Sequence, residues 1–450
     1  MLPCTPVLLI VDYNLSRIGD VSHMRNYARK QWGAQTWLVR ANPQGHDTEI
    51  SDRVIDADPL DPGFINHVLS QLGKDGTRIT AGIVFSDNAV VSGSMLLERL
   101  GLSVDDATLA LGAFDKLAYR ITEERIRPQL NLMGIISPDF VRINCLSDLR
   151  NFAAHQKKGF VIKPACEGNN RGVVMVEPGG DCEQAFLQVT PYLEKGVLAE
   201  TFITFTREYS YDGLGCLWFI TEKVSAKGRY PVEVAQILPA RLCEEELLAL
   251  RVAGEQVNQL VGQRLGPFHN EIKLSDSGYR TAVVEPNRRP GGMKIWTLAH
   301  AVYGVDLYAA WIDSAFEGGG TGCACARCMQ CCHGHVGCAL RHDGGCDRTG
   351  RSACDGSRRF VVGRPGSGSE YGRCRDYGVC VGHWRVTTGA CSSSGQQRFF
   401  GLCVCNVALR DGRYPPSSRS TAQGVAGSCQ PNPCIRTQIR GLVLTPAYST

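Results

Sequence analysis

The sequence predicts a chain of mixed class, α/β followed by α+β, that ends in a segment of different composition. Three observations carry this prediction. Short apolar runs alternate with helical patterns over residues 6–115, two strand-like runs flank a glycine-containing turn within residues 141–198, and several strand-like runs follow in residues 199–313. Alternating strands and helices indicate a parallel sheet, whereas strands in direct succession indicate antiparallel pairing.

Residues 1–115 are expected to form an N-terminal Rossmann-like domain. The strand-like runs VLLIVDY, QTWLVR, VIDAD and AGIVFSD are separated by helical stretches at residues 20–31 and 63–72, and a helix through MLLERLG follows. Strands joined through helices of about ten residues form parallel βαβ units with helices on both faces of the sheet. The first run is therefore expected to be a buried strand.

The next two segments are expected to form a small lid subdomain and a strand-rich catalytic subdomain. Residues 116–198 begin with a linker helix and continue with the strands FVIKPA and GVVMVE around a polar turn. Residues 199–317 supply the strands AETFI, EYSYDGL, LWFITEKV, FHNEIKL and YRTAVVEPN, with helices expected at 243–261 and 295–313. This strand order predicts an antiparallel sheet.

Residues 318–450 differ in composition from the rest of the chain. They hold 15 of the 21 cysteines and 16 arginines but no lysine. A folded domain needs aliphatic side chains to offset the entropy of ordering the chain, and a natural disordered tail keeps Lys and Glu. Because this composition is typical of a G+C-rich gene read out of frame, the segment is expected to be a frameshifted or disordered tail.

A zinc module is the alternative for this tail. The stretch CACARCMQCCHGHVGC holds thiolates and imidazoles of the kind that bind zinc: Cys323, Cys325, Cys328, Cys331, Cys332, His333, His335 and Cys338. Structural zinc sites show paired ligands separated by a spacer, however, and these cysteines crowd together without that spacing. A secreted disulfide scaffold is a weaker alternative, because the N-terminal residues do not resemble a secretion signal.

The bulk properties bear on the partners and the compartment. A formal net charge of +4 on 49.0 kDa is small, so no nucleic-acid partner is expected. The sequence contains no run of 18 apolar residues, so no membrane span is expected. The stretch MLPCTPVLLIVDYN lacks a basic region before its apolar run, and the expected compartment is therefore the cytoplasm.

The octapeptide EPNRRPGG at residues 285–292 is the most informative motif. Glu285, Asn287 and Arg289 occupy every second position and are expected to point to one face, since strand side chains alternate. Glu271 in FHNEIKL offers a further carboxylate from a preceding strand. Carboxylate and amide oxygens from adjacent strands suit Mg²⁺, which is commonly shared with substrate phosphates. The alternative is a surface strand with solvated charges.

Other parts of a nucleotide site precede this motif in the chain. Lys116 in FDKLAYR and Lys163 in VIKP are cations that could hold phosphate oxygens. The loop EGNNRGV contains Gly168 and Gly172, which allow backbone amides to approach phosphates closely. Such a loop alone is more often a hairpin turn. The segment AETFI, at a strand-to-loop transition, and REYSYDG add further polar candidates.

Taken in order, these motifs resemble the ATP-grasp superfamily of carboxylate-amine ligases over roughly residues 1–315, and EPNRRPGG is similar to the family's Glu-x-Asn-x-Arg-Pro-Gly-Gly. The resemblance implies an ATP-grasp fold with ATP and Mg²⁺, or Mn²⁺, as cofactors. It also implies one role for each motif residue. Lys116 and Lys163 would bind ATP phosphates, and residues 167–173, with Glu167, Gly168 and Gly172, would form the phosphate lid. Glu200 and Ile203 would contact adenine, and Glu208 would bind the ribose hydroxyls. Glu271, Glu285 and Asn287 would hold the metal, and Arg289 would stabilise the transferring phosphoryl group.

Within that superfamily the chain is similar to L-amino acid ligases, which join two amino acids. Residues 219–242 resemble the segment that shapes their acceptor pocket, and GPFHNEIKL resembles their metal strand. His269 is thereby a candidate catalytic residue, with a structural role as the alternative. The resemblance implies amino-acid-like substrates, a setting such as antibiotic biosynthesis of the tabtoxin kind, and a possible homodimer. Lys223 and Glu233 could be ordinary surface charges.

Two other hypotheses keep part of this site. An ATP-grasp enzyme could use a carboxylate that is not an amino acid, as nucleotide-biosynthetic and biotin-carboxylating relatives do, although residues 219–242 argue against this. A non-catalytic nucleotide-binding or zinc-binding protein is the third hypothesis. The complete set of Glu271, Glu285, Asn287 and Arg289 argues against a dead site.

Overall fold

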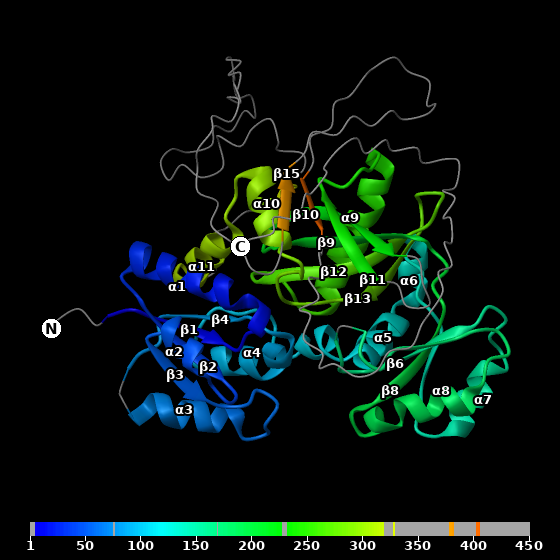
Figure 1. Ribbon diagram of the computed structural model, residues 1–450, viewed down its shortest axis with the longest axis horizontal. Helices are drawn as coiled ribbons and strands as arrows, with labels where there is room; N and C mark the ends of the chain where they lie inside the picture. Colours follow the sequence, from blue (N-terminus) through cyan, green and yellow to red (C-terminus); the bar gives the residue numbers. More distant parts are fainter. Residues whose placement is uncertain are drawn as a thin grey trace, which may run out of the picture.

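The computed structural model describes residues 5–318 apart from 75–76, 169 and 227–231, and beyond them the backbone of three short strands. It contains one parallel sheet of four strands, one antiparallel sheet of four strands, and a larger sheet whose strands pair mainly in antiparallel fashion (Figure 1). The prediction of a mixed α/β and α+β chain is confirmed. Of the candidate zinc ligands only the backbone of Cys328 is described, and the others lie outside the described residues, as does most of the predicted tail.

The N-terminal sheet has the strand order β3-β2-β1-β4, and every neighbouring pair is parallel. Its elements are β1 (Val7–Val11), α1 (Ile18–Trp32), β2 (Gln35–Arg40), α2 (Gly45–Glu49), β3 (Arg53–Asp56), α3 (Phe64–Lys74), β4 (Ala81–Val84) and α4 (Val90–Arg99), with short 3-10 turns η1 (Leu15–Arg17) and η2 (Asp87–Ala89). Alternate side chains of β1 join different cores. Leu8 and Ile10 pack with α1, whereas Leu9 packs with α3 and α4, as expected for a strand buried on both faces.

The segment predicted to be a lid subdomain contains the second sheet, in the order β5-β8-β6-β7. It comprises β5 (Phe140–Arg142), α7 (Leu146–Ala153), β6 (Phe160–Pro164), β7 (Val174–Val176), α8 (Cys182–Val189), η4 (Thr190–Lys195) and β8 (Val197–Thr201). The turn η3 (Ala110–Ala113) and helices α5 (Lys116–Arg125) and α6 (Arg127–Leu132) lead into it. The Asp115 side chain accepts hydrogen bonds from the amides of Leu117 and Ala118, so it caps α5 and fixes Lys116 at the first position of the helix.

The larger sheet runs β13-β12-β9-β10-β11 and is continued by β16 and β15, while β14 lies beside β10. Its elements are β9 (Arg207–Leu214), β10 (Leu217–Ala226), β11 (Val232–Leu238), α9 (Glu244–Leu260), β12 (Pro267–Leu274), β13 (Thr281–Glu285), α10 (Ile295–Tyr303), α11 (Leu307–Phe316), β14 (Arg327–Cys328), β15 (Gly378–Val381) and β16 (Leu402–Cys405). Helix α9 covers one face through Leu250, Ala253 and Val257, which pack against Tyr211 and Ile272.

Helix α11 returns to the N-terminal sheet, although it is far from it in sequence. Trp311 and Ile312 join the core that contains β1 and α1, and Trp311 meets Phe85 edge-on at a ring-centroid distance of 5.6 Å. Figure 1 shows α11 beside α1. The N-terminal sheet and the larger sheet therefore share one apolar core, which fixes their relative position.

Two sequence expectations need correction. Residues 295–313 were expected to be one helix, but α10 ends at Tyr303, before Gly304 with a φ of 72°, and Asp306 caps the start of α11. Strand β11 and helices α7 and α8 were not foreseen, since their apolar patterns are short. Within the described residues, no helix is both long and apolar enough to cross a membrane.

Candidate active site

The candidate site lies on one face of the larger sheet. Side chains on β9, β10 and β12 alternate, so that one face packs on α9 while the other face is polar. The strand register places Lys223 beside Glu208, Thr221 and Glu271 on either side of Ser210, and His269 beside Asp212 on this second face. The face carries Glu208, Ser210, Asp212, Thr221, Lys223, His269 and Glu271. Neighbouring strands lie about 5 Å apart, so these side chains contact one another across the sheet.

Two carboxylates at the edge of this face are each held by a lysine. Glu271 and Glu285 lie opposite each other in the β12–β13 register. Lys223 Nζ lies 2.5 Å from Glu271 Oε1, and Lys116 Nζ lies 3.0 Å from Glu285 Oε2. Burial alone would raise the pKa of both carboxyl groups, but Lys223 and Lys116 outweigh it and lower both pKa values. Both side chains are therefore anionic, and with exposed fractions of 24% and 22% they remain accessible to a ligand from solvent.

His269 lies below Glu271 on the same face and is buried. Its Nδ1 lies 2.6 Å from Asp212 Oδ1, and its Nε2 lies 3.4 Å from Glu271 Oε1. The hydroxyl groups of Ser210 and Thr221 donate to the other oxygen of Asp212 at 2.6 and 2.8 Å. Because it is only 3% exposed, the imidazole is placed to orient Glu271 rather than to meet a substrate directly. A catalytic role for His269 stays a prediction.

Asn287 and Arg289 follow the end of β13, which stops at Glu285. The sequence predicted that strand alternation aligns them with Glu285, and this prediction is wrong because the strand has already ended. Hydrogen bonds to β12 hold Asn287 in place instead. The amide of His269 donates to Asn287 O at 2.9 Å, and Asn287 Nδ2 donates to His269 O at 3.1 Å. Arg289 Nη2 lies 3.3 Å from Asn287 Oδ1, and its Nε donates to Asp87 Oδ2 at 2.6 Å.

A second charged group connects α5 to β8. Glu200 is 2% exposed, accepts a hydrogen bond from Arg120 Nε at 2.9 Å, and also pairs with the Lys163 ammonium group. Burial raises the pKa of Glu200, but the coulombic effects of Arg120 and Lys163 outweigh it and lower the pKa to about 2. In this structure the carboxylate is therefore occupied by two cations and orients Lys163. A direct contact from Glu200 to adenine stays a prediction.

The predicted phosphate lid lies next to this group. Lys116 Nζ donates to the carbonyl oxygen of Glu167 at 2.8 Å, which joins the lid loop to the carboxylate cluster. Arg171 Nη1 donates to Glu167 Oε2 at 3.0 Å, and Gly168 has open space around its Cα. Gly172 has a φ of 71°, and a Cβ there would lie 2.6 Å from the Tyr192 ring, so only glycine fits without strain.

The remaining predicted nucleotide residues lie farther along the sheet. Ile203 is half-buried in the loop between β8 and β9, and Glu208 is half-buried in β9, where Ser225 Oγ donates to its Oε2 at 3.0 Å. Glu208 shares the polar face with Glu271. Both positions are consistent with nucleotide contacts along one edge, and their roles stay predictions.

Four residues of this cluster were missed or underrated from the sequence: Asp87, Arg120, Asp212 and Lys223. Arg120 is almost fully buried and donates to the carbonyl oxygens of Val283 and Val284, just before Glu285. The signal available for Arg120 was its spacing of four residues from Lys116 on one helix, which places both on the same side. For Lys223 and Asp212 the signal was period-2 polarity within otherwise apolar strands.

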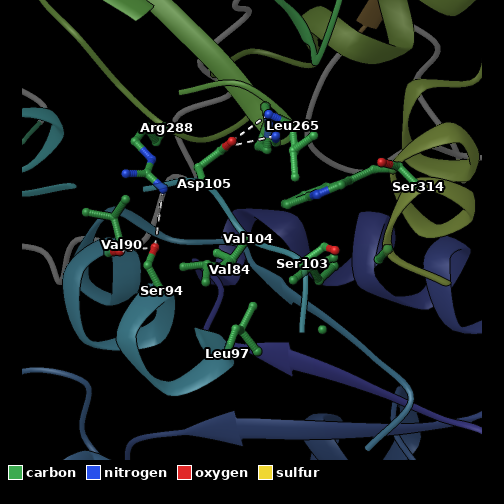
Figure 2. A pocket seen from close by; sticks show the side chains of 16 residues that line it. Val84, Val90, Ser94, Leu97, Ser103, Val104, Asp105, Leu265, Arg288 and Ser314 are labelled. Atoms are coloured by element: carbon green, nitrogen blue, oxygen red, sulfur yellow. Dashed lines mark hydrogen bonds between the residues drawn. The ribbon is translucent and has the colours of Figure 1, made fainter. Parts of the chain in front are cut away.

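Arg288 anchors the motif from behind. Figure 2 shows its guanidinium group near Ser94, and Asp105 pointing toward the amide of Leu265. Arg288 donates to the carbonyl oxygen of Asp106 at 2.7 Å, and burial lowers its pKa. The adjoining cavity has a volume of about 50 Å³. That volume suits a few water molecules rather than a nucleotide, so we assign this cavity to packing.

The chemistry of the donor set fits Mg²⁺. Glu271, Glu285 and Asn287 offer hard oxygen atoms from adjacent positions, and Lys223 and Lys116 form ion pairs with the two carboxylates. Within the described part of the chain, no group of three or more His, Cys, Asp or Glu side chains is arranged to hold a metal by itself.

Comparisons with known proteins find similarity in sequence and in structure. The D-alanine–D-alanine ligase of Ralstonia pickettii strain 12J is 26% identical over 154 residues, which are 34% of this chain and 44% of that ligase. The chain thus matches less than half the length of this curated relative. No protein-family model matches the chain.

Solved structures extend the comparison to the fold. The L-amino acid ligase of Bacillus licheniformis aligns with a TM-score of 0.57 and 20% identity, over 70% of this chain and 75% of that one. The biotin carboxylase domain of Hydrogenobacter thermophilus 2-oxoglutarate carboxylase, solved with MgADP and bicarbonate, aligns with a TM-score of 0.52 and 16% identity over 69% of each chain. These similarities show the fold. That fold is the one which the resemblance to ATP-grasp enzymes implied.

Proposed function

We propose that this chain, with its ATP-grasp fold, is an ATP-dependent ligase that joins an amino-acid carboxylate to an amine and releases ADP and phosphate. One observation carries the proposal: two anionic carboxylates, two lysines and an arginine from four separate segments come together on one face of the larger sheet. These residues are Lys116, Lys223, Glu271, Glu285 and Arg289. We further propose that residues 1–115, 116–198 and 199–317 act as the N-terminal, lid and catalytic units.

Nucleotide binding would fall to the lysines and the lid loop. Lys163 is fixed by Glu200 and Lys116 by Glu285, so both ammonium groups are held in place before a phosphate arrives. Preorganised cations stabilise phosphate charge more effectively than mobile ones because little reorganisation is needed on binding. The lid loop carries Gly168 in open space, which leaves its backbone accessible to phosphate oxygens.

Mg²⁺, or Mn²⁺ in its place, would be held by Glu271, Glu285 and Asn287 and would supply charge neutralisation at the phosphates. Neighbouring residues of the chain keep the two carboxylates anionic and orient all three metal-binding side chains. Lys223 and His269 hold Glu271, while the backbone pairing between His269 and Asn287 fixes the amide. Such supporting contacts orient metal ligands and set their basicity.

The chemistry follows from the need to make an amide in water. A carboxylate is a poor electrophile, so one of its oxygens first takes the γ-phosphoryl group of ATP, which gives an acyl phosphate and ADP. The amine then attacks the acyl carbon, and phosphate leaves with that carboxylate oxygen. Arg289 lies beside Asn287 and would neutralise the charge on the transferring phosphoryl group.

The names of the relatives support an amino-acid substrate. One matches as a D-alanine–D-alanine ligase and another as an L-amino acid ligase, and both names describe the joining of amino acids. Dipeptide formation, a role in antibiotic biosynthesis of the tabtoxin kind, a cytoplasmic site of action and a homodimeric state remain our predictions. The chain is also similar to a biotin carboxylase domain, so an assay without amino-acid-dependent turnover would favour a carboxylate substrate that is not an amino acid.

The test is a substrate screen. The purified protein is incubated with Mg-ATP and pools of amino acids, while phosphate release and product masses are followed. We expect phosphate release that depends on amino acids and a product with the mass of two amino acids less one water. ATP binding without phosphate release from any pool would contradict the amino-acid substrate and favour another carboxylate.

A further inference from the structure

Asp87 lies at the carboxyl edge of the N-terminal sheet, at the point where the strand order reverses. The chain runs outward from β1 through β2 to β3 and then returns to place β4 on the other side of β1. Ser86 and Asp87 follow β4, and Ser86 Oγ donates to Asp12, which follows β1. Ligands of open α/β sheets bind in the crevice at such a point, so polar groups here are placed to line a ligand-binding site.

The carboxylate of Asp87 reaches across to the catalytic subdomain. Arg289 Nε donates to Asp87 Oδ2 at 2.6 Å, although the two residues are 202 positions apart in sequence. The same guanidinium donates from Nη1 to Pro290 O at 3.2 Å and from Nη2 to Asn287 Oδ1 at 3.3 Å. Because a guanidinium is planar, contacts at three of its nitrogen atoms fix both its position and its rotation. Asp87 supplies the charged one of these contacts.

The rest of the motif is also fastened to the N-terminal part of the chain. Arg17 donates to the carbonyl oxygens of Pro290 and Gly291, and Lys294 Nζ lies 2.9 Å from Asp20 Oδ1. These contacts hold the backbone of residues 290–294, whereas Asp87 holds a functional side chain. The Asp87 side chain is 32% exposed, so it borders open space beside Arg289 rather than packed core.

We propose that Asp87 is a positioning residue which aims the Arg289 guanidinium at the transferring phosphoryl group. This inference rests on the proposed function for the role of Arg289. Without Asp87, the arginine side chain keeps two weaker contacts to neutral oxygens and gains rotational freedom. A misplaced catalytic group lowers the rate of the chemical step without weakening the binding of the nucleotide.

The direct alternative is that Asp87 binds an amino group of the substrate. The two roles separate in the kinetics. A positioning residue changes kcat and leaves KM nearly unchanged, whereas a carboxylate that contacts the substrate changes KM for that substrate. They also separate in a double-mutant cycle, because a residue that acts through Arg289 has no further effect once Arg289 is removed.

The experiment compares Asp87→Ala, Asp87→Asn, Arg289→Ala and the double variant Asp87→Ala/Arg289→Ala in the full chain. Glu98→Gln, at an exposed position on α4 of the same unit, is the matched control. We expect kcat to fall about 10- to 100-fold in Asp87→Ala and less in Asp87→Asn, with KM values unchanged within about two-fold. The double variant should be no slower than Arg289→Ala. Asp87→Asn keeps the side-chain size, so it serves if Asp87→Ala is unstable.

Additive losses in the double variant, or an increased KM for an amino acid at unchanged kcat, would overturn the positioning role. A wild type that forms no product in any pool counts against the proposed function instead. In that case affinity for MgADP with fluoroaluminate, which mimics the transferring phosphoryl group, decides the role of Asp87. We expect Asp87→Ala to weaken that complex about 10-fold while MgADP alone binds normally, and equal affinity for the fluoroaluminate complex would refute the inference.

Discussion

Replacing Glu200 with glutamine removes the carboxylate that Arg120 and Lys163 share, and its effect follows from the structure. Glu200 has a pKa of about 2 instead of its ordinary value of 4.5, since the two cations outweigh the effect of burial. A change of one pKa unit corresponds to about 1.4 kcal/mol, so this carboxylate contributes on the order of 3 kcal/mol to folding at neutral pH. Glu200→Gln should lose most of that contribution.

The pH dependence has a definite sign. Because the pKa is lowered in the folded state, the contribution is complete above the unfolded pKa of 4.5 and is lost as the pH falls toward about 2. Between about pH 6 and about pH 3.5, wild type should lose about 1.4 kcal/mol from this group alone. The stability difference between wild type and Glu200→Gln should therefore shrink by that amount over the same range.

Urea denaturation followed by circular dichroism at several pH values measures this difference, with Glu98→Gln on the exposed face of α4 as the control. The control should show a small difference that does not change with pH. ATP affinity supplies a second readout, since an unpaired Lys163 is no longer held for phosphate. A stability difference that stays constant from pH 6 to pH 3.5 would refute the assignment of Glu200 as the anionic partner of both cations.

Three further predictions concern the site itself. Arg289→Ala should bind ATP normally but turn over about 100-fold or more slowly, because losing one preorganised donor costs about 3 kcal/mol of transition-state stabilisation; normal turnover in steady-state kinetics would refute its role. Lys163→Ala should weaken nucleotide affinity in calorimetry, and an unchanged Kd would count against the phosphate contact. Chelation of divalent ions should abolish turnover until Mg²⁺ is restored, and Glu271→Gln should raise the Mg²⁺ concentration needed for half-maximal rate; an unchanged requirement would exclude Glu271 as a metal ligand.

Most of the fold could be predicted because its signals are local. The four apolar runs of the N-terminal unit form the four strands of the parallel sheet, and the pattern of alternating helices predicted their parallel pairing. The break between α10 and α11 was missed, since both helices are apolar and a left-handed Gly304 in an apolar run does not mark a helix end by itself. Strand β11 was missed because periodicity alone does not distinguish a strand from a helix in a short apolar run.

The site was predictable where one short motif carries several groups, and less so where partners come from distant segments. Glu285, Asn287 and Arg289 lie within five residues, so their common purpose could be inferred from the sequence. Asp87 is 202 residues away from Arg289, and no periodicity connects them. The burial of Lys223 between Glu271 and Glu233 likewise depends on strand register, which the sequence leaves open.

The central claim is that a carboxylate is activated by direct transfer of the γ-phosphoryl group. Amino-acid pools labelled with ¹⁸O in their carboxyl groups, incubated with the protein and Mg-ATP, test this most directly by mass spectrometry of the released phosphate. Our account predicts one ¹⁸O atom in each phosphate, because the carboxylate oxygen leaves with the phosphoryl group when the amine attacks. Product formation with unlabelled phosphate would contradict the account.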